Sequence, residues 1–197
     1  MKSFKQFISE MPQNVGDSTA TIADDKMNAI VYSTRSQHTP IGKIGYYSVH
    51  HNKKGKESQF SVLDHPNKRV GFSTTVERRP KNKNIPFSHN TQTYVGRDPK
   101  TDLGRGFGSN FVYDRLVRNS DVPLASDAQQ YTGGHKMWHS LIDKAHKEGH
   151  HAYLSDNGQL SRITPENKAE VMASSYGKGD EFKNKRYVIS KTPLTQD

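Results

Sequence analysis

Short runs of β-branched and aromatic residues, separated by turn residues such as His65-Pro66-Asn67, mark the first half of the chain. This pattern is typical of strands joined by tight connections. The early runs follow one another closely, which favours antiparallel hairpins. We expect strands over Ala29–Thr34, Ile44–His50, Phe60–Leu63, Val70–Val76 and Thr91–Val95.

Helical periodicity is confined to the second half of the chain. Gly134–Lys147 is the clearest case, because its apolar residues fall on one face and its charged residues on the other. Ser109–Arg118 has helical composition, and Thr164-Pro165 predicts the start of a short helix that runs to Ala173.

Strands are also expected between and after these helices. Asp156-Asn157-Gly158 is a strong hairpin signal between the runs His151–Leu154 and Gln159–Ile163. Further apolar runs cover Val122–Ser126 and Tyr187–Ser190. The whole pattern predicts an α/β (α+β) domain, in which a mixed, mostly antiparallel sheet is flanked by a few helices.

The first residues differ in pattern from the rest. Phe4, Phe7, Ile8 and Met11 have the i, i+3, i+4, i+7 spacing of a helix with one apolar face, and Pro12 ends it. Polar and small residues follow, which indicates a linker with little to bury. We therefore divide the chain into a leader helix (1–10), a linker (11–26) and one domain (27–197).

The leader resembles the capsid-targeting sequences of internal head proteins of T-even phages. It opens with Met-Lys, and Ile8-Ser9-Glu10 matches the Ile-x-Glu triplet after which the prohead protease of those phages cuts. The resemblance implies cleavage between Glu10 and Met11, with the prohead scaffold and protease as partners. It also implies a place inside the virion and then in the bacterial host cytoplasm. The alternative is an ordinary N-terminal helix that frays.

Composition supports one modest domain with a strongly basic surface. The chain has 197 residues, of which 31% are hydrophobic, and no cysteine, so disulfides and thiolate chemistry are excluded. No apolar run reaches membrane-spanning length, so we expect no membrane partner. The net charge of +9 favours polyanions such as packaged DNA. The basic clusters Lys53–Lys56 and Arg78–Lys83 are either solvated loops or phosphate contacts.

A glycine-rich turn carries the candidate chemistry. It joins a predicted strand to a predicted helix, so its backbone N–H groups can converge on an anion at the positive end of the helix dipole. Glycine lets a phosphate approach the backbone closely. The alternative is a simple connector. The turn consists of Leu103, Gly104, Arg105, Gly106, Phe107, Gly108 and Ser109.

The order of elements around this turn resembles the GNAT N-acetyltransferase family, in which an Arg/Gln-x-x-Gly-x-Gly/Ala turn binds the pyrophosphate of acetyl-CoA. Gly106 and Gly108 match the two glycine positions, whereas Leu103 stands where Arg or Gln is usual, and Arg105 can supply charge from nearby. Pro123–Asp127, Thr132–Gly134 and Met137-Trp138 also resemble GNAT-like proteins of phages. The resemblance implies acetyl-CoA as cofactor, no metal, and an unknown host amine as acceptor.

In that family an amine attacks the thioester directly, a base takes its proton and a hydroxyl protonates the leaving thiolate. Asp127 is the candidate base, and Tyr131 or Ser126 the candidate acid. Their alternative role is hydrogen bonding within a loop. Leu103 and the absence of an unambiguous base leave a second hypothesis open: a catalytically inactive, basic capsid or DNA-associated protein, or a host-defence inhibitor, that uses the fold as a binding surface.

The histidine spacing in the predicted helix does not indicate a metal site. His135 and His139 have the spacing of two helical metal ligands, and His146 lies on the same flank. Lys136, however, stands where zinc proteases need a glutamate, and its charge opposes a bound cation. We therefore expect no metal.

Overall fold

A computed structural model of the chain describes residues 32, 37–127, 132–175 and 182–195. The leader, the linker and the predicted cleavage site at Glu10 and Met11 lie outside the described residues. In this described part of the chain, nine strands form one sheet in the order β1-β2-β3-β4-β5-β6-β9-β7-β8. The strands are β1 (Thr39–Ile44), β2 (Tyr47–Lys54), β3 (Glu57–Asp64), β4 (Arg69–Arg79), β5 (His89–Arg97), β6 (Leu124–Ala125), β7 (His151–Asp156), β8 (Gln159–Ile163) and β9 (Lys185–Ser190).

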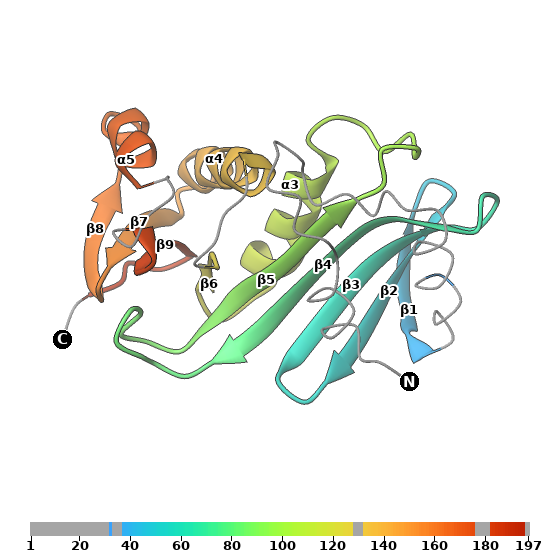
Figure 1. The fold of residues 1–197 in the computed structure, drawn as a ribbon, viewed down its shortest axis with the longest axis horizontal. Helices are drawn as coiled ribbons and strands as arrows, with labels where there is room; N and C mark the ends of the chain where they lie inside the picture. Colours follow the sequence, from blue (N-terminus) through green and yellow to red (C-terminus); the bar gives the residue numbers. More distant parts are fainter. Residues whose placement is uncertain (1–31, 33–36, 128–131, 176–181, 196–197) are drawn as a thin grey trace.

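Within the described residues from 37 onward, the helical segments are α3 (Phe107–Val112), the π-helical η2 (Tyr113–Arg118), α4 (Thr132–Lys147) and α5 (Lys168–Ser174). The strands β1 to β5 run antiparallel side by side, and the shorter β6, β9, β7 and β8 continue the sheet (Figure 1). Among the described strands, only β5 and β6 pair in parallel. Parallel strands need a long crossover, and α3 and η2 supply it. The predicted α+β class, with a mostly antiparallel sheet and a few helices, is confirmed.

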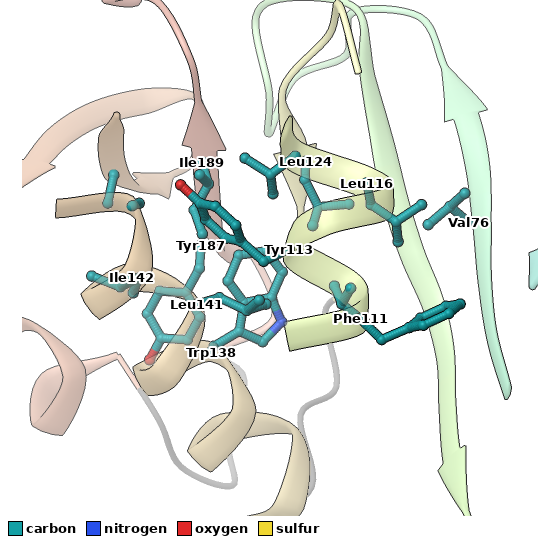
Figure 2. Packing of buried hydrophobic residues seen from close by; sticks show 14 of the residues in the cluster. Val76, Phe111, Tyr113, Leu116, Leu124, Trp138, Leu141, Ile142, Tyr187 and Ile189 are labelled. Atoms are coloured by element: carbon teal, nitrogen blue, oxygen red, sulfur yellow. The ribbon is translucent and has the colours of Figure 1, made fainter. Parts of the chain in front are cut away.

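The main core lies between the sheet and the helices. Apolar residues of β2, β3 and β4, such as Val49, Val62 and Phe72, share one buried cluster with Phe111 of α3 and Trp138 of α4. Side chains of α3, η2, α4 and β9 meet in this core (Figure 2). The apolar stripe predicted for Gly134–Lys147 therefore faces inward. No helix in the described part of the chain is long and apolar enough to cross a bilayer.

Several predicted boundaries were wrong. The run Ile44–His50 is not one strand, because a turn at Gly45 and Tyr46 separates β1 from β2, and Gly45 has a φ of 58° that only glycine adopts easily. Tyr32, the one described residue of the predicted strand 29–34, is helical.

The helix predicted from Thr164 begins at Lys168 instead. The amide of Thr164 donates to Oδ1 of Asn167 at 2.8 Å, and the amide of Asn167 donates to Oγ of Thr164 at 3.3 Å. These bonds form a turn that precedes the helix. The remaining predicted strands and helices are confirmed within a few residues.

The connection between β4 and β5 (residues 80–88) packs across the sheet onto its second half. Ile85 is buried with Ala125, Tyr153 and Val188. Ser155 of β7 donates a hydrogen bond from its hydroxyl to the carbonyl of Asn84. The two halves of the sheet are therefore joined by this loop as well as by the β5–β6 pair.

Candidate functional site

The glycine-rich bend leads from β5 into the continuous helical segment 107–118. The amide of Phe107 donates to the carbonyl of Gly104 at 3.1 Å, and that of Asn110 donates to Gly106 at 3.0 Å. Between them, the amides of Gly108 and Ser109 have no acceptor among the described residues. Two N–H groups are thus left at the positive end of the helix, where an anion can accept them.

The outer side of the bend is open to solvent. Gly104, Arg105 and Gly106 are exposed. A Cβ built on Gly104 or on Gly106 would meet no other atom within 4 Å. Arg105 forms no ion pair with a described residue. No described residue therefore fills the space beside Gly104 and Gly106, and the guanidinium of Arg105 is available next to it.

Glycine is favoured at each position of the bend for a different structural reason. Gly106 has a φ of 80°, a left-handed conformation that side chains disfavour. At Gly108 the reason is packing, because a Cβ there would lie 2.9 Å from Cε2 of Phe72. The sequence argument, close approach of a phosphate, fits Gly104 best, where space is free and φ is ordinary.

Leu103 belongs to the core rather than to the open surface. Its side chain is only 4% exposed, and its carbonyl accepts a hydrogen bond from the guanidinium of Arg97. The position therefore anchors the bend to the sheet. Its side chain points away from the solvent side on which an anion would bind.

The parallel pair of β5 and β6 is short. Only Asn90 with Leu124, and Thr91 with Ala125, are in register, although β5 continues to Arg97. Beyond Thr91, no described strand pairs with β5 on that side. The strand continues past the short β6 toward the loop that leads to α3 (Figure 1). From Gln92 to Arg97, at the end that leads to the glycine-rich bend, β5 therefore has no described strand beside it on the β6 side.

The predicted acid and base residues follow β6 but differ in access. Ser126 is fully buried, and its Oγ accepts the amide of Tyr187 at 3.0 Å. Asp127 is half-buried next to Arg186: burial lowers the pKa of Arg186, and the Asp127 carboxylate opposes that effect. Tyr131 lies outside the described residues. Ser126 is thus held within the structure, whereas Asp127 is partly accessible.

The structure joins three residues that the sequence argument did not connect. Nδ1 of His135 lies 3.3 Å from the hydroxyl of Tyr187, which lies 2.6 Å from Oγ of Ser175. Burial lowers the pKa of His135 to about 4, and the charge of His139 acts in the same direction. The imidazole is therefore neutral at pH 7 and begins a chain of exchangeable protons. Only the fold brings α4, β9 and the end of α5 together.

The remaining histidines of α4 have local partners. The rings of His135 and His139 meet edge to face, with centroids 4.9 Å apart. Nε2 of His146 lies 2.9 Å from the carbonyl of Ile163. No group of three potential metal ligands occurs among the described residues.

Comparison of the chain with family models, curated proteins and solved structures gives no match.

Proposed function

We propose that this chain is a GNAT-like N-acetyltransferase that binds acetyl-CoA at the glycine-rich bend and transfers the acetyl group to an amine of the host. The observation that carries the proposal is the open glycine-rich bend, which follows the part of β5 that no described strand joins on the β6 side. The bend is the feature that the resemblance to the GNAT family implies.

The bend fits a diphosphate in its charge and in its space. The amides of Gly108 and Ser109 and the guanidinium of Arg105 are available, and Gly104 leaves room beside the backbone. Hydrogen bonds from amides to an anion are stronger than those between neutral groups. We expect this backbone cradle to hold the pyrophosphate in spite of the buried Leu103.

The proposed reaction is a direct transfer. The amine nitrogen attacks the thioester carbonyl, the C–S bond breaks, and the proton lost by nitrogen is balanced by one gained by sulfur. Asp127 is the proposed base, because its side chain is partly accessible, whereas Ser126 is buried. His135 is a second candidate, although a pKa of about 4 makes it a weak base.

Calorimetry with acetyl-CoA tests the proposal. We expect saturable binding of one acetyl-CoA per chain, and competition by free CoA. The absence of a heat of binding at millimolar acetyl-CoA would overturn the proposed acetyltransferase activity. Release of thiol in the presence of amine acceptors then separates catalysis from binding.

A scaffold that binds without turnover is the second candidate. Two observations favour it: the hydroxyl of Ser126 is already engaged, and Leu103 contributes no charge to the bend. In that case the basic chain would act as a capsid-associated or DNA-associated protein or as an inhibitor of host defence. The virion location implied by the leader is common to both candidates.

A further inference from the structure

A basic cavity of about 390 Å³ lies at the opposite end of the helical segment 107–118 from the glycine-rich bend. Its walls come from η2 and the residues that follow it, from the turn between β2 and β3, and from β4 and β5. Four cationic side chains line it: Lys53, Lys56, Arg78 and Arg115. We call it the basic cavity.

None of its lining residues is acidic. None of the four cations forms an ion pair with a described residue, whereas Arg69, Arg79 and Arg118 are all paired with carboxylates. The carboxylates adjacent to the four cations in sequence are Asp114, which is paired with Arg118, and Glu57 and Glu77, which are register partners across β3 and β4. The side chains of Glu57 and Glu77 point to the opposite face from the cavity-lining pair Ser58 and Val76, because side chains alternate along a strand. The positive charge in the cavity is therefore not neutralised from within the described chain.

Hydrogen bonds connect the walls of the basic cavity. The amide of Arg78 donates to the carbonyl of Lys56 at 2.8 Å, which ties β4 to the β2–β3 turn. On the opposite wall, the side-chain amide of Asn90 donates to Oγ of Ser120 at 3.3 Å. One backbone bond and one side-chain bond thus join neighbouring elements of the cavity wall.

Its floor is apolar. Val76 and Leu116 are 4% and 3% exposed, and Phe60 packs against the same cluster. Leu116 of η2 and Val76 of β4 lie in the layer where the helix covers the sheet (Figure 2). A low-dielectric floor strengthens the attraction between cations at the rim and a bound anion.

Arg115 is the most informative of the four. The residue is half-buried, and its guanidinium forms no ion pair with a described residue. Its nitrogens are not among the buried polar atoms that lack a partner, so the head group is open to solvent. Arg115 can therefore present its guanidinium to an anion in the cavity.

We propose that the basic cavity binds the phosphodiester backbone of a nucleic acid. Four unpaired cations in one cavity match a run of phosphates better than a single small anion. The net charge of +9 attracts a polyanion to the chain as a whole. Amide donors such as Asn90 and Asn119 also line the cavity. The proposal is independent of acetyl-CoA binding, because it concerns residues of η2 and the β2–β3 turn and not of the bend.

Fluorescence anisotropy with a labelled DNA duplex, measured over a series of salt concentrations, tests the proposal on the full chain. The test variant changes Lys53, Lys56, Arg78 and Arg115 to Gln. The matched control changes four exposed lysines outside the cavity to Gln, so that the net charge is equal: Lys81, Lys83, Lys136 and Lys147. Circular dichroism and thermal melting establish that both variants fold. If the test variant fails to fold, the single change Arg78→Gln, at an exposed position, is compared with Lys83→Gln.

Each phosphate contact contributes roughly −0.9 to the slope of log K against log salt. We expect the loss of four contacts in the test variant to flatten this slope by about 3.6, and the control to change it far less. Equal losses in the two variants would show that only the overall charge matters and would overturn the proposal. Binding of inorganic phosphate or a mononucleotide that depends on the cavity, without DNA binding, would also overturn it, in favour of a small-phosphate site.

Discussion

The ring of Phe72 fills the space beside Gly108, where a Cβ would lie 2.9 Å from Cε2 of that ring. Phe72 is almost completely buried, and its ring also meets those of Phe107 and Phe111 edge to face. The start of α3 is therefore held against β4 by aromatic packing, and this packing sets the position of the glycine-rich bend.

Replacing Gly108 by alanine should overpack this contact. We expect Gly108→Ala to destabilise the protein by about 1–3 kcal/mol, because Phe72 cannot move freely in a filled core. Urea denaturation measures the loss. Adding Phe72→Leu should recover part of it, so that the double variant costs less than the sum of the two single changes. Strict additivity would show that the two residues do not constrain each other.

A negative charge at Gly104 should weaken acetyl-CoA binding without disturbing the fold. The position is exposed, a Cβ there is unobstructed, and φ is ordinary. A carboxylate near a bound diphosphate repels it, so we expect Gly104→Asp to raise the Kd by about tenfold or more. Ser161→Asp, at an exposed position of β8 on the far edge of the sheet, makes the same charge change and should leave the Kd unaltered. Equal effects of both variants would contradict binding at the bend.

Stability should depend on pH through His135. Burial lowers the pKa of its imidazole from 6.5 to about 4, so between these values the unfolded chain binds a proton that the folded chain does not. Stability is therefore lost as the pH falls from 6.5 toward 4. His135→Gln should lose less stability between pH 7 and pH 4.5 than the unaltered protein, as measured by urea denaturation at both values. The same pH dependence in both would show that His135 titrates normally.

The leader gives a prediction about virions. Mass spectrometry of purified particles should find a chain that begins at Met11, because the triplet Ile8-Ser9-Glu10 matches the cut site of the prohead protease. Glu10→Gln should keep the chain at full length. Absence of the protein from particles, or an uncut chain in the unaltered phage, would contradict the packaging hypothesis.

Most strands and helices could be predicted from the sequence, because periodicity and turn residues are local signals. The segments Gly134–Lys147 and His151–Ile163 are examples, with boundaries within a few residues. The helix predicted from Thr164 was displaced because the residues before Lys168 form a hydrogen-bonded turn that composition does not reveal.

Less of the candidate site could be predicted from the sequence. The bend itself could be found, since glycine spacing is visible in the chain. The contact between Gly108 and Phe72, the burial of Ser126 and the chain from His135 to Ser175 depend on residues far apart in sequence. The basic cavity combines two regions that look like separate solvated loops until η2 is placed beside them.

The connection 80–88 has a mechanical consequence. β5 and β6 share only two residue pairs, so this seam by itself is a short connection between the two parts of the sheet. The loop bridges the seam through the hydrogen bond between Ser155 and Asn84. It also brings the carbonyl oxygen of Lys83 so close to Gly158 that a Cβ on Gly158 would lie 2.6 Å from that oxygen. The loop therefore braces the two parts of the sheet against each other, and residues outside the strands help to set their relative position.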